Sequence, residues 1–197
     1  MRKWFFYLII IISGVSFQAN KPQITKWVIT SGCVLKVTGS TNINRFSCEI
    51  INYSKPDTVI ITRLPNLPVY LSGSIRLDVQ NFNCHNPVMT ADLRKTLKVK
   101  EFPKLSIRFI SLSKYPDAAS RHSTTKGIVM IELAGVSRPY EVDYKIVSSD
   151  NNFINLVGTR RVSFSEFNLV PPRKLGGMIK TNNELTVEFN VRFKVLN

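Results

Sequence analysis

Residues Glu184–Leu196 read ELTVEFNVRFKVL, with apolar and polar side chains at alternate positions. A period of two over this length predicts a β-strand that buries one face in a core and shows the other to water. The same alternation returns in Val69–Val79. Long two-faced strands of this kind build antiparallel sandwiches and barrels. The sequence therefore predicts an all-β architecture whose function depends on what the buried faces enclose.

Shorter alternating or apolar segments predict the remaining β-strands. They are Trp27–Thr38, Asn44–Ile50, Thr58–Thr62, Leu105–Phe109, Val129–Leu133, Tyr140–Ile146 and Phe153–Ser163. Residues that favour turns separate them, as in Gly39–Asn42, Pro65–Pro68 and Gly135–Pro139. We expect eight or nine strands in total.

One helix interrupts the strands. Asn86 is a good N-cap residue, and Pro87 suits the first helical position. Arg94 and Lys95 lie toward the negative end of the helix dipole. The apolar residues of the segment fall at nearly helical spacing and predict one stripe that packs against the core: Val88, Met89, Leu93 and Leu97.

Residues 1–19 are predicted to be a secretory signal peptide, followed by one domain over residues 20–197. Arg2 and Lys3 precede the apolar run Trp4–Ile12, and small residues follow it. The run is too short to span a bilayer comfortably. Cleavage after Ala19 and cleavage after Ser16 both fit the pattern. We expect a periplasmic or secreted protein.

The chain has three cysteines, which leaves one unpaired in an exported protein. Cys48 and Cys84 share a local pattern, because each follows a phenylalanine two positions earlier. We predict a disulfide between these two. Cys33 is then a buried thiol that packs like a small apolar residue, and a catalytic thiol is the alternative.

The formal net charge is +14, and a basic protein is attracted to nucleic acid or to anionic membranes. Export argues against nucleic acid. The basic residues are spread along the chain and predict a solvated basic surface, with at most a weak contact with anionic lipid head groups.

The sequence offers no positive sign of catalysis. His85 and His122 are the only histidines, and they form no pair with metal-ligand spacing. A metal site at Cys84 and His85 needs a free thiolate, which the predicted disulfide removes. We therefore predict a protein that is not an enzyme and has neither a metal nor a cofactor.

The order of these segments resembles the YceI-like family, in the variant with paired Phe-x-Cys segments found in Bacteroidetes-type bacteria. The resemblance spans roughly Trp27 to Val195 and rests on the order of several short motifs. These are Val37–Asn42, Phe46–Cys48, Met89–Lys98, Glu101–Phe109 and Gly135–Pro139.

The resemblance implies an eight-stranded antiparallel, lipocalin-like barrel with one capping α-helix. It also implies an apolar interior that holds a polyisoprenoid or similar lipid, and a barrel of eight strands encloses one small ligand. We expect a periplasmic or secreted protein that binds such a lipid. Both a monomer and a homodimer are compatible with the sequence. The alternative is a non-catalytic scaffold or partner-binding module whose barrel is filled by its own side chains.

Alternation selects the residues expected to line the interior, with ordinary core packing as the alternative for each. They are Leu35, Val37, Phe46, Leu71, Ile75, Ile107, Phe109, Ile131, Tyr144, Val187, Phe189 and Val191. A register shift of one residue would move any of them to the outer face.

Overall fold

The computed structural model describes residues 21–53, 55–116, 122–149 and 152–196, so the predicted signal peptide lies outside the described residues. The described chain contains one α-helix, α1 (Pro87–Thr96). Its main sheet is formed by ten strands: β1 (Gln23–Ile29), β2 (Cys33–Ser40), β3 (Arg45–Tyr53), β4 (Thr58–Arg63), β5 (Val69–Asp78), β6 (Lys104–Leu112), β7 (Thr124–Leu133), β8 (Val136–Ser149), β9 (Phe153–Ser163) and β12 (Glu184–Leu196). Two short strands, β10 (Arg173–Lys174) and β11 (Ile179–Lys180), form a separate hairpin.

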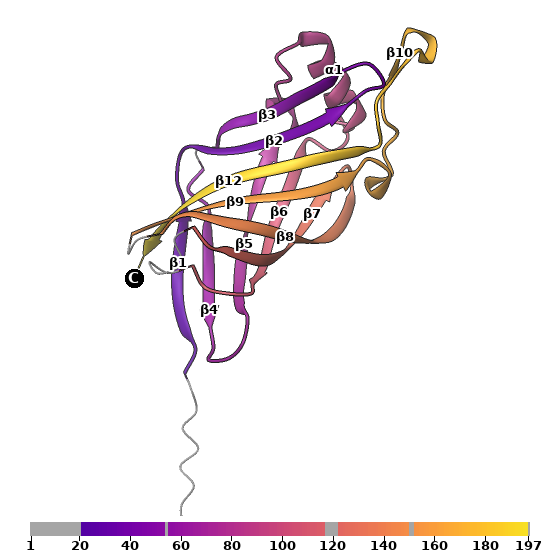
Figure 1. Cartoon of the computed structure of the whole chain (residues 1–197). Coiled ribbons are helices and arrows are strands. Elements are labelled where there is room, and N and C mark those ends of the chain that lie inside the picture. Colours follow the sequence, from indigo (N-terminus) through magenta and orange to yellow (C-terminus); the bar gives the residue numbers. More distant parts are fainter. Residues whose placement is uncertain (1–20, 54, 117–121, 150–151, 197) are drawn as a thin grey trace, which may run out of the picture.

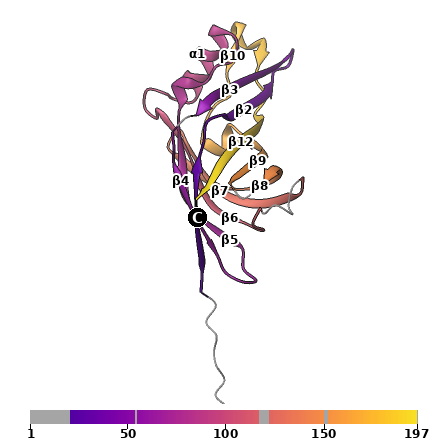
Figure 2. The same cartoon turned by 90° about the vertical axis from the view of Figure 1, so that its left-hand side faces the viewer.

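Eight of these strands close into an antiparallel barrel (Figures 1 and 2). The order around the ring is β1-β4-β5-β6-β7-β8-β9-β12, and β12 pairs back with β1. Closure leaves no free edge in this ring, which removes the hazard of edge-to-edge pairing with another chain. The predicted fold class, an eight-stranded lipocalin-like barrel with one helix, is confirmed.

The strand β12 holds two partners on one edge. Its first half pairs with β2, with Val187 opposite Val37, and its last residues pair with β1, with Phe193 opposite Ile29. The chain bends between the two at Gly32, whose φ of 87° favours glycine. The expected single strand Trp27–Thr38 is therefore two strands, and the β2–β3 hairpin extends the wall beyond the closed ring (Figure 1).

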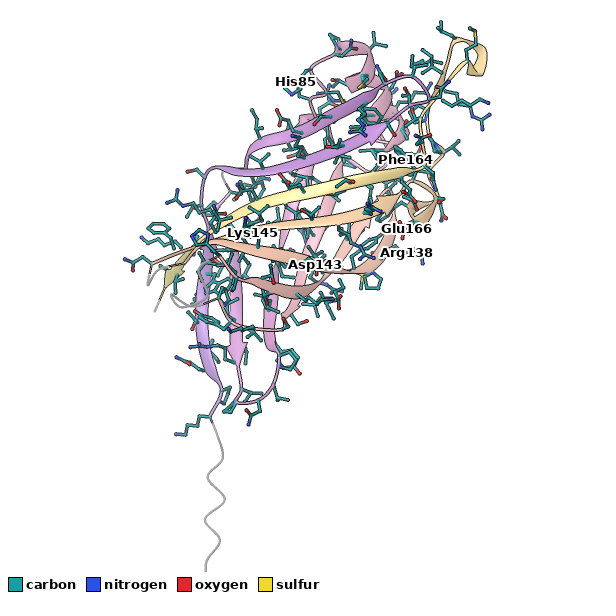
Figure 3. The ribbon with its side chains drawn as sticks, viewed as in Figure 1. His85, Arg138, Asp143, Lys145, Phe164 and Glu166 are labelled. Atoms are coloured by element: carbon teal, nitrogen blue, oxygen red, sulfur yellow. A yellow bond between two sulfur atoms is a disulfide. The ribbon has the colours of Figure 1, made fainter. Side chains whose placement is uncertain are left out.

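The alternation predicted for the long strands holds in three dimensions. On β8, the side chains of Val142, Tyr144 and Ile146 are buried. Asp143 and Lys145 lie between them on the outer face (Figure 3). The apolar core thus occupies the inside of the barrel, and the polar set faces water.

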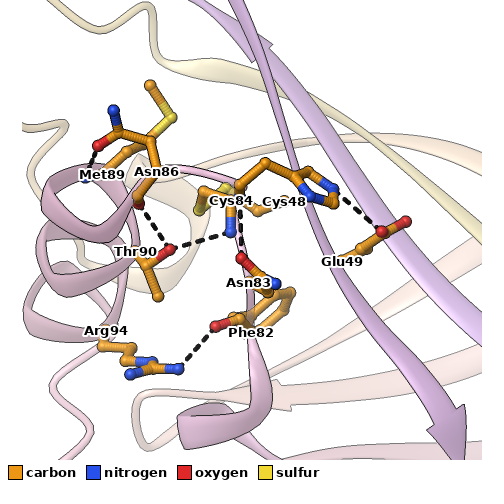
Figure 4. The surroundings of a disulfide bond; sticks show 10 residues. Cys48, Glu49, Phe82, Asn83, Cys84, Asn86, Met89, Thr90 and Arg94 are labelled. Carbon is orange, nitrogen blue, oxygen red and sulfur yellow. Dashed lines mark hydrogen bonds and ion pairs between the residues drawn. A yellow bond between two sulfur atoms is a disulfide. The ribbon is translucent and has the colours of Figure 1, made fainter.

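A disulfide joins β3 to the segment that precedes α1. Among the described strands β3 pairs only with β2, and its other edge meets the segment that precedes α1 (Figure 4). The Glu49 amide donates to the Asn83 carbonyl at 2.8 Å, and the Asn83 amide donates to the Glu49 carbonyl at 2.9 Å. The predicted disulfide joins Cys48 to Cys84 at this point.

Helix α1 begins where the sequence predicts. The Asn86 side chain accepts a hydrogen bond from the Met89 amide at 3.0 Å, which caps the helix (Figure 4). Leu93 is buried, but Val88 is 63% exposed. The prediction that Val88 belongs to the buried stripe was wrong, because five residues of helix turn it roughly 140° away from Leu93.

Breaking the disulfide should destabilise the fold. The bond spans a separation of 36 residues, and closing a loop of that length restricts the unfolded chain by about 3–4 kcal/mol. We expect the variant Cys48→Ala/Cys84→Ala to lose about this much free energy of unfolding in urea titrations. A reducing agent should destabilise the parent but not the variant, and equal sensitivity of the two would contradict the assignment.

Candidate ligand-binding interior

Two small apolar cavities lie inside the barrel. One has a volume of about 30 Å³ and is bordered by side chains of β2, β3, β5, β6, β8 and β12, and the other, of about 60 Å³, extends to α1. Leu35, Ile107 and Phe189 border both. These three side chains therefore form a partition between two parts of one apolar interior.

The structure brings together most of the residues that alternation selected. Ten of the twelve border one or both cavities: Leu35, Val37, Ile75, Ile107, Phe109, Ile131, Tyr144, Val187, Phe189 and Val191. Leu71 is buried opposite Ile61 of β4 but borders neither cavity. Phe46 is half-buried and borders a groove outside the closed ring.

Sequence reasoning missed other cavity residues. Leu105 and Leu185 border the larger cavity and share the alternation of Ile107 and Val187, so the same rule includes them. Leu97 of the helix segment also borders it, although core packing was the favoured interpretation of its stripe. Phe167 lies in a short 3₁₀ turn after β9, and no periodic signal marks it.

Two glycines make room for the ring of Tyr144. A methyl group on Gly158 would lie 2.6 Å from its Cε1 atom, and one on Gly127 would lie 2.7 Å from its Cε2 atom. The ring of Phe189 follows, with centroids 6.4 Å apart. Gly127 and Gly158 thus let a large ring lie against the inner wall beside the smaller cavity.

An aromatic cluster fills the barrel beyond the smaller cavity. Trp27 and Phe193, both almost fully buried, have ring centroids 5.2 Å apart. Phe193 also contacts Phe109, at 6.0 Å, and Phe109 borders that cavity. These rings stop the apolar space at this end.

The interior is chemically neutral. Over the described ranges, no Asp, Glu, Lys, Arg or His side chain borders either cavity. Burial raises the pKa of the Tyr144 phenol and of the Cys33 thiol, so both stay protonated near neutral pH. The Cys33 thiol donates to the Thr30 carbonyl at 3.1 Å.

Within the part of the chain that the structure describes, no three His, Cys, Asp or Glu residues lie close enough to hold a metal ion. No helix there has the length and apolar character needed to cross a bilayer.

A third apolar space opens at the surface near α1. It has a volume of about 310 Å³ and lies between the β2–β3 turn, the first turns of α1 and the β10–β11 hairpin. Phe164 borders it from the end of β9 (Figure 3). Leu93 borders both this groove and the larger cavity, so its side chain lies between the surface and the interior.

Filling the glycine slot should destabilise the barrel. In Gly158→Ala the new methyl group would overlap Tyr144 and Phe189, and overpacking of this kind costs about 1–3 kcal/mol. We expect urea unfolding to show that loss, and Tyr144→Leu in the same chain to recover part of it. Full stability of Gly158→Ala would show that the ring has room to move.

Solved structures of three bacterial proteins share this architecture. A polyisoprenoid-binding domain from Saccharophagus degradans matches over 86% of this chain and 98% of its own, with a TM-score of 0.62 and 10% identity. Burkholderia cenocepacia BcnA matches over 81% and 95%, with a TM-score of 0.56 and 9% identity. The Campylobacter jejuni YCEI protein matches over 71% and 81%, with a TM-score of 0.52 and 14% identity.

No protein-family model matches the sequence, and no curated protein matches it at a significant level. At sequence identities of 9–14%, similarity in structure establishes the fold alone. The structure has a closed ring of strands and a capping helix, and each of the three solved structures matches it over most of both chains. This chain therefore has the lipocalin-like barrel fold of the YceI proteins.

Proposed function

We propose that the protein binds one apolar chain, of a polyisoprenoid or another lipid, in the barrel interior. The observation that carries the proposal is the pair of apolar cavities inside the barrel, which share Leu35, Ile107 and Phe189 and are bordered, over the described residues, by no charged side chain. Apolar surface removed from water contributes about 25 cal/mol per Å². An apolar chain in these two cavities would gain that energy without desolvating a charge.

Binding requires the interior to open. An engineered apolar cavity that accepts benzene has a volume of about 150 Å³, and the two cavities here measure about 30 and 60 Å³. A bound chain therefore displaces the partition formed by Leu35, Ile107 and Phe189. The energy of moving these side chains is subtracted from the binding energy.

The fold comparison supports this function, because one structural neighbour is described as a polyisoprenoid-binding domain. The neutral interior supports a role in binding without catalysis. The basic start and apolar run of residues 1–19 support export to the periplasm or out of the cell. A binding protein of this kind would keep an insoluble chain in solution between membranes.

A self-filled scaffold is the second candidate, and the small cavity volumes favour it. In that case the barrel side chains are the final packing and the surface carries the function. The two candidates differ in one property, which is whether the interior accepts a guest.

The lipid content of the purified protein distinguishes the lipid-binding function from the self-filled scaffold. We expect protein purified from an exporting bacterium to release an apolar chain on denaturation and solvent extraction, detected by mass spectrometry at close to one molecule per barrel. Val187→Phe should lower this content at least several-fold, because the larger side chain fills the cavity that Val187 borders.

Thr186→Phe is the matched control, because Thr186 is the exposed neighbour on the same strand. It should leave the lipid content unchanged, while circular dichroism shows that both variants fold. If the parent holds no lipid and binds no added polyprenol, the interior is closed and the scaffold is the correct function.

A further inference from the structure

One end of the barrel displays apolar side chains to solvent around the groove. Leu175 and Met178 of the β10–β11 hairpin are 68% and 74% exposed. Ile43 in the β2–β3 turn and Val88 in the first turn of α1 are exposed to a similar degree and border the groove itself. We call this end, formed by residues 170–181, the β2–β3 turn and the start of α1, the mouth face.

The mouth face is also basic. Residues 170–181 include Arg173, Lys174 and Lys180 and contain no acidic residue. Lys174 is neutralised by Asp92 of α1, at 2.7 Å. Among the described residues, no acidic side chain lies within ion-pair distance of Arg173 or Lys180, and both are exposed.

The hairpin is held in place by specific contacts. The Asn42 side chain donates to the Met178 carbonyl and accepts from the Lys180 amide, both at 2.9 Å. The Asn42 amide donates to the Lys180 carbonyl at 3.1 Å. With the Lys174–Asp92 pair on the other side, the hairpin is fixed to both the β2–β3 turn and the helix. Its apolar tip therefore projects from the end of the barrel (Figures 1 and 2).

We propose that the mouth face docks on the surface of an anionic lipid bilayer. The arrangement matches the layers of such a surface, because apolar tips enter the boundary of the acyl chains while flanking basic residues stay among the head groups. Leu93 borders both the groove behind the tip and the larger cavity, so its side chain lies between the two. Docking in this position lets an apolar chain pass from the bilayer to the barrel without crossing water, and this last step rests on the proposed function.

A second copy of the chain fits the mouth face less well. A twofold contact brings the same patch of both partners together, so the unpaired positive charges of Arg173 and Lys180 would be doubled within one interface. An acidic protein would satisfy the charges, but it would leave the opening of the apolar groove without a role. The bilayer uses both features.

Vesicle sedimentation tests the docking. The full chain is mixed with phosphatidylcholine vesicles, with or without phosphatidylglycerol, and every variant keeps the same amino terminus so that residues 1–20 contribute equally. We expect binding that requires phosphatidylglycerol and weakens with salt. Leu175→Ser/Met178→Ser should reduce it about tenfold, and Arg173→Gln/Lys180→Gln about fivefold for each basic residue removed.

Matched controls lie elsewhere on the barrel. Leu67→Ser removes a half-exposed leucine from the β4–β5 connection, at the opposite end (Figure 1). Lys36→Gln/Lys194→Gln removes two exposed charges from the wall strands β2 and β12. Both should bind like the parent. Equal losses in the controls, or equal binding to vesicles without anionic lipid, would overturn the proposal.

Two further measurements separate the outcomes. Sedimentation velocity without vesicles should give a monomer for the parent, and a dimer that Leu175→Ser/Met178→Ser dissociates would make the mouth face a self-interface and refute the docking. Lipid extraction from the same samples reports on the interior. A protein that contains lipid but does not bind vesicles would refute the docking and leave the proposed function intact. A protein that binds vesicles but contains no lipid would support the docking and contradict the proposed function.

Discussion

The structure depends on the two-sided pairing of β12. One edge of this strand pairs with β9 from Glu184 to Lys194, and the other pairs first with β2 and then with β1. The pairing with β1 closes the ring, and the pairing with β2 carries the wall beyond it. Because every second side chain of β12 points inward, the same strand supplies Val187, Phe189 and Val191 to the interior. The pairing that closes the barrel therefore also determines which side chains of β12 line its interior.

The two ends of the interior are built differently. Trp27 and Phe193 pack their rings together beyond the smaller cavity. At the other end the wall is a hairpin, a disulfide and a helix, and Leu93 is the one side chain shared by the cavity and the surface groove. The interior therefore has one end closed by packed aromatic rings and one end formed by separate elements.

Much of this was predictable from residue order. Alternation placed ten of the twelve selected residues at the cavities, because a closed antiparallel ring gives all its strands a common inner face. Phe46 obeys the same alternation, but its end of β3 borders the surface groove, whereas Ile50 and Tyr53 farther along β3 border the smaller cavity. Val88 was misplaced because its spacing from Leu93 matches the helical repeat only loosely.

Local sequence patterns were enough to predict the strand faces, the start of the helix at Asn86 and the pairing of Cys48 with Cys84. The tertiary structure decided the volume of the interior, the slot that Gly127 and Gly158 provide for Tyr144, and the meeting of the β10–β11 hairpin with Asn42 and Asp92. These properties join residues far apart in the chain. Their geometry is set by the register of the closed ring, which no single strand carries.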